Sequence, residues 1–483
     1  MPTEFALQAD VVVVGAGLAG NAAALAAAEA GATVCLLEKG RAFGGSSVLA
    51  GGGLAFAGTD MQQALGMQDS VEALRRDLLE TGAGRNDPQM LQAYLDHQLA
   101  TFEWLRERGV DFKLAPATLP GGVNRIHGTE IGEVTRVLHG RVLAHPKVVY
   151  ARNARVHRLL RSAVGRVHGA RAEIEGREVG VQAHRGVVLA SGGFVRNAQL
   201  LCTFAPQWID AIKMGGRDNT GDGFLMACAL GAGLADMAYI EATLGASLDR
   251  YPDLAQREGD SPSLLFPVIR GAILVNLDAR RFANESLNYK VLGAAGARQP
   301  KGVAFQIFDR KVMERSLPSP APANYKEAHR RGIVRAADSV AALALGLGLD
   351  AARLRETIDR YNTAALNGAD PEHGRPIPDY GTPGGACIDT PPFYAFACAA
   401  ALTTTYCGIR TDARMRVRDV WGEPIPGLYA AGEVTGGFHG AAYLSGTALG
   451  KAAVHGRLAG LACAQDLSQD PRHDPRHDPR TPR

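Results

Sequence analysis

A turn near the start of the chain carries three glycines whose spacing is suited to binding a dinucleotide. Gly15, Gly17 and Gly20 follow an apolar run at residues 11–14, and an alanine-rich stretch at residues 21–30 comes after them. The apolar run is typical of a buried parallel strand, and the alanine-rich stretch favours a helix. In such a turn the first glycine allows the sharp bend, the second lets a pyrophosphate approach the backbone, and the third lets helix and strand pack closely. The helix N-terminus would then face the phosphates.

A carboxylate and a second glycine-rich segment follow this turn. The apolar run at residues 33–37 ends at Glu38, where a carboxylate can accept hydrogen bonds from an adenosine ribose. Glycines and serines come next, where a nicotinamide enzyme would continue into ordinary α/β units. Such a run offers backbone donors and close approach to a second phosphate and a flat ring, so it favours FAD over NAD. The residues of this region expected to bind the cofactor are Gly15, Gly17, Leu18, Ala19, Gly20, Glu38, Lys39, Gly44, Gly45, Ser46, Ser47, Gly51, Gly52 and Gly53.

Two later segments are expected to contribute to the cofactor site. Residues 148–188 form short alternating segments that predict a small antiparallel sheet, and the last segment runs into small residues where the backbone would meet the adenosine side. Asp222 precedes a helical run at residues 224–231, so its carboxylate could cap that helix, contact the ribityl hydroxyls, or do both. The candidates in these segments are Val156, Ala190, Ser191, Gly192 and Asp222.

Apolar positions three and four apart predict two amphipathic helices beside the nucleotide core. One spans residues 62–82 and the other spans residues 87–109, and each ends at a glycine. A final helix is predicted over residues 445–464.

The order of these patterns predicts an α/β protein with a discontinuous domain. Residues 1–240 and 389–466 are expected to form a Rossmann-like FAD-binding domain in two parts. Residues 241–388 show no dinucleotide pattern, so an inserted α+β domain that caps the substrate is expected there, with hinges near both ends. The tail, residues 467–483, repeats DPRH and contains no apolar residue except proline, so it is expected to be disordered.

Composition and charge are those of an ordinary globular protein. The chain is 46% apolar and 21% charged, and its net charge of +3 is too small to indicate binding to nucleic acid or a membrane surface. No run approaches the roughly 18 uninterrupted apolar residues of a spanning helix, and the start lacks a signal pattern, so a cytoplasmic protein without a transmembrane segment is expected. The seven cysteines form no CxxC, so neither a dithiol partner for a flavin nor a metal site is expected.

Further motifs along the chain resemble those of a known superfamily. They are GGSS and GGG after the first turn, ASGGF at 190–194, GDG at 221–223, RRFANES at 280–286, GEPIPGLYAAGEVTGG at 422–437 and YLSGTALG at 443–450. Together they resemble the flavoproteins that include fumarate reductases, succinate dehydrogenases, L-aspartate oxidases and ketosteroid dehydrogenases, over nearly the whole chain except the tail.

The resemblance implies roles for the last two motifs. Gly432 and Glu433 would contact the ribityl or pyrophosphate region, and Thr447 and Leu449 would face the pyrimidine edge of the flavin at a helix N-terminus. Relatives that bind FAD covalently carry a histidine in the loop matching residues 45–48. Because this loop is GSSV, noncovalent FAD is expected.

The departures from the fumarate reductase pattern disfavour a dicarboxylate substrate. Fumarate reductases have a histidine where this chain has residues 403–406 and an arginine where it has Tyr443, and both side chains clamp substrate carboxylates. Their proton-donating arginine would fall where this chain has Met313. Without these cations the charge-assisted bonds to a dicarboxylate are lost, so fumarate and succinate are disfavoured.

Tyrosines stand in their place, and they resemble those of the ketosteroid dehydrogenases that desaturate the 4,5 bond. Tyr289 follows the NE motif, and Tyr443 and Ser445 lie two residues apart at the start of the flavin-edge helix. Tyr443 is predicted to take the α-proton, with its phenolate favoured by the helix N-terminus and Ser445 as relay. Tyr289 or a backbone amide would hold the carbonyl oxygen while flavin N5 takes the hydride. The catalytic candidates are therefore Tyr443, Tyr289, Ser445 and Tyr406.

The leading hypothesis is an FAD-dependent enzyme that dehydrogenates, or in reverse reduces, the C–C bond next to the carbonyl of an apolar, ketosteroid-like ketone. The first alternative is a fumarate reductase-like enzyme for an unsaturated or polycarboxylic acid such as tricarballylate, with Arg125, Arg281 or Arg310 as carboxylate clamps. The second is a non-catalytic electron-transfer flavoprotein. The expected partners are a small-molecule substrate and an electron acceptor that the sequence does not identify.

Overall fold

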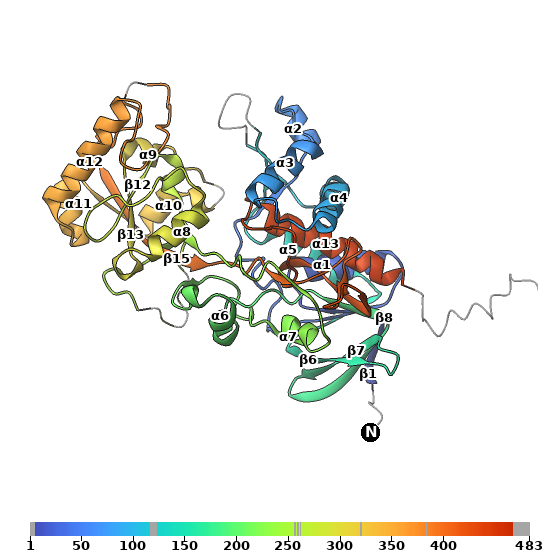
Figure 1. Cartoon of the computed structure of the whole chain (residues 1–483). Helices are drawn as coiled ribbons and strands as arrows, with labels where there is room; N and C mark the ends of the chain where they lie inside the picture. Colours follow the sequence, from blue (N-terminus) through green and yellow to red (C-terminus); the bar gives the residue numbers. More distant parts are fainter. Residues whose placement is uncertain are drawn as a thin grey trace, which may run out of the picture. The chain divides into compact units, whose positions relative to one another are not determined.

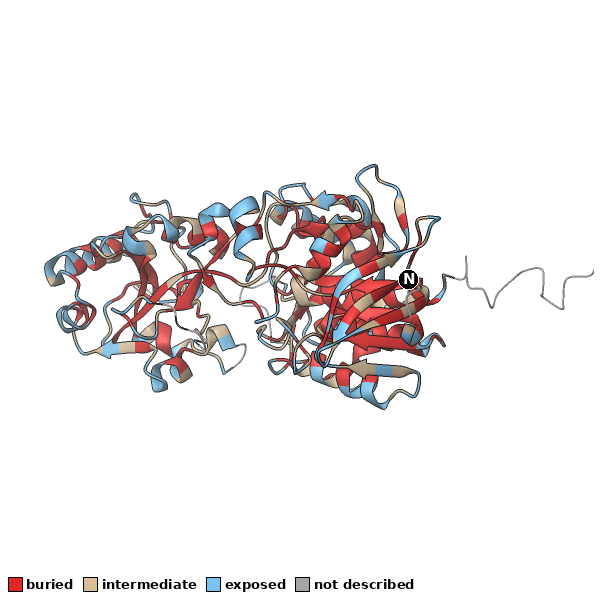
Figure 2. Cartoon of the chain, turned by 90° about the horizontal axis from the view of Figure 1, so that it is seen from below, coloured by how far each residue is buried: buried red, intermediate tan, exposed pale blue. Residues whose placement is uncertain are grey.

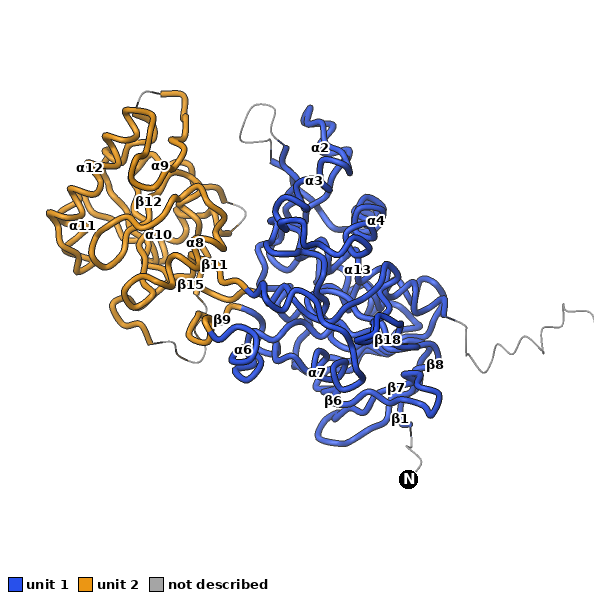
Figure 3. Tube along the Cα trace, viewed as in Figure 1, with its two compact units in different colours: residues 1–206, 215–240, 404–483 blue, residues 207–214, 241–403 orange. Residues whose placement is uncertain are grey.

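The chain divides into two compact units, each built from separate stretches of the sequence. The computed structural model describes residues 5–115, 123–255, 257, 260, 262–318, 321–382 and 384–466. Unit 1 comprises Met1–Pro206, Gly215–Ile240 and Thr404–Arg483, and unit 2 comprises Gln207–Met214 and Glu241–Thr403 (Figure 3). The tail at 467–483, for which disorder was predicted, lies outside the described residues.

Unit 1 is built on a largely parallel sheet with the order β17-β18-β8-β1-β2-β5, and β7 and β6 extend it from β8 (Figure 1). β18, β8, β1, β2 and β5 are parallel neighbours, as expected of a Rossmann-like core. Valines at the end of β1 are fully buried, which suits a strand covered on both faces. The strands are β1 (Phe5–Val14), β2 (Val34–Leu37), β5 (Val148–Ala151), β6 (Ala154–Arg161), β7 (Val167–Ile174), β8 (Arg177–Leu189), β17 (Arg416–Arg418) and β18 (Pro424–Ala430).

The helices of unit 1 cover this sheet and carry the cofactor turns. Short strands form two further pairs, β3 (Gly53–Ala55) with β4 (Ile126–Gly128) and β10 (Leu234–Ala235) with β16 (Gly408–Ile409). The helices are α1 (Leu18–Glu29), α2 (Asp60–Ala64), α3 (Val71–Thr81), α4 (Pro88–Glu107), α5 (Glu133–Ala144), α6 (Ala198–Phe204), α7 (Asp222–Cys228) and α13 (Thr447–Ala464), with short 3-10 turns that include η5 (Gly432–Val434).

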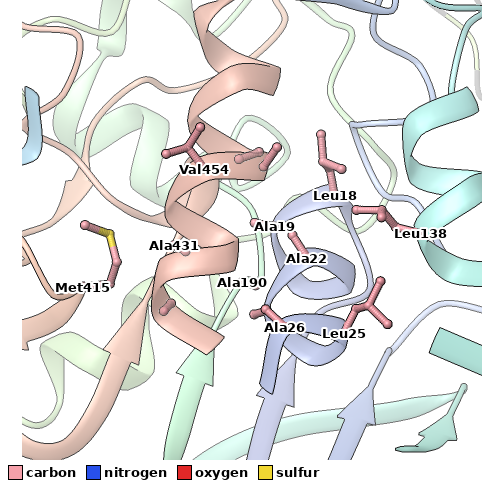
Figure 4. Close-up of a cluster of buried hydrophobic side chains, with 14 of the residues drawn as sticks. Leu18, Ala19, Ala22, Leu25, Ala26, Leu138, Ala190, Met415, Ala431 and Val454 are labelled. Atoms are coloured by element: carbon pink, nitrogen blue, oxygen red, sulfur yellow. The ribbon is translucent and has the colours of Figure 1, made fainter. Parts of the chain in front are cut away.

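α1 and α13 approach each other through small residues. A Cβ atom added to Gly456 would lie 2.5 Å from the carbonyl oxygen of Ala19, and one added to Gly460 would lie 2.1 Å from that of Ala23. Figure 4 shows the apolar cluster around this contact, with Leu18 and Ala22 of α1 and Val454 of α13. The alanine-rich sequence of α1 therefore serves close packing on nearly all sides of the helix.

Two predictions for this unit need correction. The expected helix at 62–82 is wrong as a single element, because α2 ends at Ala64 and Ser70 caps a separate helix, α3. The antiparallel pairing predicted at 148–188 is confirmed for β6, β7 and β8, which pair in that order, but these strands are part of the main sheet and do not form a separate one. β5 joins the main sheet parallel to β2, and β8 pairs with β7 on one side and runs parallel to β1 on the other. The helix predicted at 87–109 is confirmed by α4, with Asp87 as its N-cap.

Unit 2 is an antiparallel sheet with helices, as expected of an α+β insert. Its sheet has the order β11-β15-β13-β12, and β14 and β9 also pair with β15. The strands are β9 (Ile212–Lys213), β11 (Thr243–Ser247), β12 (Ile273–Val275), β13 (Ala304–Asp309), β14 (Val334–Ala337) and β15 (Phe393–Leu402). The helices are α8 (Tyr289–Ala297), α9 (Arg310–Glu314), α10 (Tyr325–Arg330), α11 (Val340–Leu347) and α12 (Ala351–Leu366). Figure 2 shows buried residues concentrated in the strands of both units.

The boundary expected at residue 388 differs from the one observed. β15 was assigned to the second part of the FAD-binding domain, yet its residues 393–398 pair with β13 and it also pairs with β11 and β14. Its ladder hydrogen bonds therefore belong to unit 2. Residues 207–214 also belong to unit 2, because β9 pairs in parallel with the last two residues of β15.

Candidate active site

The first glycine turn has the geometry that its sequence predicts. Gly15 has φ +102°, and a Cβ atom on Gly20 would lie 1.7 Å from the carbonyl oxygen of Gly15. Both glycines are therefore required by the protein's own packing. Gly17 differs, because the nearest atom to a Cβ there is Ser47 Oγ at 3.6 Å. The turn thus leaves space in front of Gly17, and a pyrophosphate fits that space at the start of α1.

Glu38 is held at the carboxyl ends of β1 and β2. Its Oε2 accepts a hydrogen bond from the backbone N–H of Ala16 at 2.8 Å, and its Oε1 accepts one from Gly40 at 2.7 Å. The carboxylate is buried, and a carboxylate has about four lone-pair sites, so capacity remains for ribose hydroxyls.

Lys39 and Asp222 form an ion pair across a large sequence separation. Lys39 Nζ donates to Asp222 Oδ2 at 3.1 Å and to Thr220 Oγ1 at 2.6 Å. Burial raises the pKa of Asp222, but Lys39 and the Thr220 hydroxyl outweigh it and hold that pKa below its usual value. The capping role is wrong, because Asp222 is the first residue of α7 and Gly221 occupies the N-cap position without a side-chain bond.

The GGSS loop is tied to the turn by its serines. Ser47 Oγ accepts from the backbone N–H of Leu18 at 3.1 Å, and Ser46 Oγ accepts from Gly216 at 3.0 Å. Gly44 donates its N–H to the carbonyl oxygen of Ala16 at 2.9 Å. The serines therefore position the loop, and backbone groups are left to face a ligand. The remaining glycines of this region, Gly51, Gly52 and Gly53, lead into β3.

Glu433 is fixed by two groups that the sequence analysis missed. Its Oε2 accepts from Asn219 Nδ2 at 2.8 Å, and its Oε1 accepts from the backbone N–H of Thr405 at 3.1 Å. Asn219 also donates to Ser46 Oγ at 3.2 Å, so one amide joins the two predicted cofactor segments. The sequence signal that could have identified Asn219 was its position two residues before the GDG motif at 221–223.

The end of β8 lies beside this group and offers polar atoms to a ligand. A Cβ atom on Gly193 would lie 2.2 Å from Thr405 Oγ1. The hydroxyl oxygens of Ser191 and Thr405 are buried without a hydrogen-bond partner in the described part of the chain. Buried hydroxyls of this kind fit a polar ligand such as the ribityl chain of FAD. Ala190 and Gly192 flank Ser191, and Val156 is buried in β6.

Helix α13 begins without a side-chain cap, and a tyrosine takes part of that role. Gly446 is the N-cap, with φ +83°, and it donates its N–H to the phenol oxygen of Tyr443 at 2.8 Å. Thr447 Oγ1 donates to the carbonyl oxygen of Leu444 at 2.5 Å, which secures the turn. Leu449 is half-buried in the first turn, and Ser445 is exposed.

Three aromatic rings gather in front of this helix start. The ring of Tyr406 stacks on that of Tyr443 with centroids 5.0 Å apart, and His439 meets both rings edge-on at 5.2 and 5.5 Å. Tyr406 has φ +57°, a conformation that is uncommon for a residue with a side chain. His439 was not among the predicted site residues, although it lies between the GEVTGG and YLSG motifs.

The protonation of Tyr443 differs in part from the prediction. Burial raises its pKa, and the backbone N–H groups of Gly446 and Ala448 lower it only partly. The helix N-terminus does favour the phenolate, as predicted, but desolvation outweighs it. Tyr443 is therefore a neutral phenol near pH 7, with donors in place to stabilise negative charge as its proton leaves.

Tyr289 belongs to unit 2 and begins helix α8. Its ring stacks on Phe266 with centroids 5.2 Å apart and an interplanar angle of 29°. Asn288 caps this helix, since its Oδ1 accepts the backbone N–H of Lys290 at 2.9 Å. Tyr406, Tyr443 and Ser445 all lie in unit 1.

Two of the three arginines considered as carboxylate clamps, Arg125 and Arg281, are engaged within the protein. Arg125 forms ion pairs with Asp69 at 2.7 Å and Asp77 at 2.5 Å. Arg281 is fully buried and pairs with Glu285 at 2.6 Å and Asp370 at 2.8 Å. These guanidinium groups support the fold, and so they do not serve as clamps. Arg310 is exposed, with Glu314 4.0 Å away.

The described residues contain no cluster of three or more histidine, cysteine, aspartate or glutamate side chains arranged to hold a metal ion. Among the helices of the described ranges, none combines the length and the apolar character needed to cross a membrane.

Comparisons with known proteins bear on this site. A family model described as an FAD binding domain matches residues 10–449. The chain is 33% identical over 469 residues to a fumarate reductase (cytochrome) of Shewanella frigidimarina, covering 94% of this chain and 77% of that protein. It is 30% identical over 476 residues to a urocanate reductase of Eggerthella lenta, covering 96% and 76%. Among solved structures, 3-ketosteroid-delta4-(5alpha)-dehydrogenase from Rhodococcus jostii RHA1 matches with a TM-score of 0.73 and 28% identity, covering 96% and 98%.

Proposed function

The chain belongs to the fumarate reductase and succinate dehydrogenase superfamily of FAD-dependent oxidoreductases, which act on CH–CH groups, and from this we propose that its substrate is an apolar ketone of the 3-ketosteroid class. The reaction is dehydrogenation of the C–C bond next to the carbonyl, or the reverse reduction. FAD, when bound, supplies the acceptor or donor of a hydride. Noncovalent binding is part of the proposal, because the GGSS loop carries no histidine.

The observation that carries this proposal is the placement of the Tyr443 phenol oxygen on the N–H of Gly446. By resemblance, fumarate reductases have an arginine at this position, which clamps a carboxylate. A phenol that accepts backbone N–H groups at a helix N-terminus is instead suited to moving a proton.

Tyr443 and Ser445 provide a path for that proton. In the oxidising direction the phenol proton passes to Ser445, which is exposed, and on to water. The resulting oxygen anion is stabilised by Gly446 and Ala448, and it takes the acidic α-proton of the ketone. In the reducing direction the neutral phenol donates its proton to that carbon.

Other side chains are assigned to binding and orientation. Tyr406 covers one face of Tyr443 and restricts its ring to one orientation. Tyr289, supported by Phe266, would donate its hydroxyl proton to the carbonyl oxygen as negative charge develops there. The cofactor residues named above hold FAD by its phosphates, ribose and ribityl chain.

A second candidate function is reduction of an unsaturated acid, and the names of the fumarate and urocanate reductases favour it. The engagement of Arg125 and Arg281 counts against it, because a carboxylate clamp needs a cation with unused donors, and it leaves Arg310 as the exposed candidate among the three. The third hypothesis, an electron carrier without catalysis, is not retained, because the relatives are reductases and dehydrogenases.

Anaerobic reduction of the bound flavin separates these functions. We expect a saturated 3-ketosteroid to bleach the flavin absorbance, and succinate and tricarballylate to leave it unchanged. Bleaching by the acids alone would overturn the ketone assignment and support the second candidate. Fast reduction by NADH alone would instead identify a reductase that accepts electrons from a nicotinamide.

A further inference from the structure

The loop at residues 432–440, with the sequence GEVTGGFHG, links the cofactor residues to the aromatic cluster. It begins at Gly432 and Glu433 and passes through His439 toward Tyr443. Gly432, Gly437 and Gly440 have positive φ, so the backbone path is sharply bent. Such a path needs outside groups to hold it, because the glycines themselves are permissive.

Three charged side chains hold this loop at three different points. Glu433 is bound by Asn219 and Thr405, as described above. Asp236 Oδ2 accepts the N–H of Gly437 at 2.7 Å, and Asp236 also accepts from the backbone of Gly440. Lys451 donates from Nζ to the carbonyl oxygen of Thr435 at 2.6 Å, between the other two points.

Lys451 is an unusual residue for its position. It lies in the second turn of α13, its side chain is 2% exposed, and the mechanism above does not use it. In the described part of the chain it makes no other hydrogen bond and no ion pair within 4 Å. Burying an ammonium group is costly unless nearby negative charge offsets it. Asp236 and Glu433 supply that charge.

Two other titratable groups that face Lys451, the thiol of Cys407 and the imidazole of His455, do not change charge near neutral pH. Burial raises the pKa of the Cys407 thiol, and burial lowers the pKa of His455 to about 3. His97 of α4 faces His455, and Asp87, the N-cap of α4, faces Asp236, so both belong to the same surroundings. Burial lowers the pKa of Lys451 to about 8, while Asp236 and Glu433 oppose that shift.

We propose that Lys451 is a positioning residue of the FAD site, whose ammonium group holds the 432–440 loop between Asp236 and Glu433 in the conformation that binds FAD. The proposal concerns cofactor binding and does not depend on the identity of the substrate. A deprotonated Lys451 still donates a hydrogen bond to Thr435, but its charge no longer offsets the negative charge of Asp236 and Glu433.

The sign of the pH dependence follows from this arrangement. If FAD binds the loop that the ammonium group holds, binding stabilises the protonated form and raises the pKa of Lys451 in the complex. By linkage, FAD affinity is then full below the pKa of the free protein and falls as pH rises through and beyond 8. A rise of one unit in the pKa of Lys451 corresponds to about a tenfold change in the dissociation constant.

The test measures release of FAD from the full-length holoenzyme between pH 6.5 and 9.5 by ultrafiltration. For the unmodified protein we expect the dissociation constant to rise about tenfold across this range. For Lys451→Met we expect weak binding at every pH and no slope, whereas Lys451→Arg should extend tight binding to higher pH. A purely structural role would weaken binding in Lys451→Met and leave the unmodified protein without a slope.

Lys290 offers a matched control in unit 2. It is also a buried lysine whose Nζ donates to a backbone carbonyl, that of Glu241 at 2.9 Å. Lys290→Met should keep the FAD affinity and its slope. A flat profile in the unmodified protein would overturn the proposal even if Lys451→Met failed to fold, and so would a slope that persists in Lys451→Met. Neither result bears on the ketone assignment, which the bleaching experiment tests separately.

Discussion

Tyr443 in unit 1 and Tyr289 in unit 2 both stand at the start of a helix, yet their surroundings differ. Helix α8 is capped by Asn288, which takes up the N–H of Lys290, and the ring of Tyr289 stacks on Phe266. Helix α13 has no side-chain cap, and the phenol oxygen of Tyr443 accepts an N–H there itself. Negative charge is stabilised at a helix N-terminus only where its N–H groups are available. The two helix starts therefore differ, because the phenol oxygen of Tyr443 accepts a backbone N–H that would stabilise negative charge on it, whereas the start of α8 is capped by Asn288.

The sharpest test of this difference is Tyr443→Phe. We expect turnover to fall by about 10³- to 10⁴-fold, because the proton-transfer group is lost while the ring and its stacking on Tyr406 remain. FAD content, read from the flavin absorbance of the purified protein, should be unchanged. Full activity in this variant would end the proton-transfer assignment.

Arg281→Met tests whether unit 2, which carries Tyr289, can lose stability without a change at the FAD site of unit 1. The change removes the nearest cation from the buried carboxylates of Glu285 and Asp370 and leaves Glu285 with Arg375 at 3.5 Å, so we expect unit 2 to lose about 3 kcal/mol of stability. Denaturant unfolding followed by circular dichroism measures this loss. FAD affinity should remain as it was, because the bonds to Glu38 and Glu433 lie in unit 1. A fall in FAD affinity of the same size as the loss of stability would contradict that separation.

Tyr289→Phe should have a smaller effect than Tyr443→Phe. The ring keeps its contact with Phe266 and only the hydroxyl donor is removed, so kcat/KM should fall by about 10²-fold. Tyr394→Phe provides a control, because this buried tyrosine stacks on Phe308 elsewhere in unit 2 and should retain full activity. Equal losses in Tyr289→Phe and Tyr443→Phe would break the comparison between the two helix starts.

The pH dependence of dehydrogenation gives the finest distinction. Because burial raises the pKa of Tyr443, the phenolate fraction grows up to about tenfold per pH unit through the neutral range, and the rate should follow it without a plateau. Initial rates between pH 6 and 9 measure this slope. Tyr289→Phe should keep the slope and Tyr443→Phe should lose it, and a slope that is absent from the unmodified protein would point to another base.

Local rules account for the part of the fold that sequence reasoning reached. Gly15 is needed for its positive φ and Gly20 for its close approach to the carbonyl oxygen of Gly15, and both are local requirements that the spacing of the glycines reveals. The strand, the helix and Glu38 all lie within residues 11–38, so they can be recognised together along the chain. The comparisons confirm FAD as the cofactor. The α/β class and the antiparallel insert were predicted for the same reason, since hydrophobic period and strand order are readable along the chain.

Contacts between distant segments account for what was missed. Asn219 reaches Glu433 across 214 positions, and Lys39 reaches Asp222 across 183. No local period marks such pairs. The end of unit 2 was also misplaced, because β15 is an apolar strand that would suit either sheet, and only its pairing with β13 assigns it.

The sequence by itself indicated that this protein uses a dinucleotide cofactor, because the spacing of Gly15, Gly17 and Gly20 reflects local requirements of the backbone. Only the tertiary structure decided how the tyrosines differ and which charges hold the 432–440 loop. The N–H groups at the start of α13, the burial that raises the pKa of Tyr443, and the approach of Lys451 to Thr435 all arise from packing. Desolvation and hydrogen-bond geometry depend on the folded surroundings of a residue, and its neighbours in the chain do not specify them.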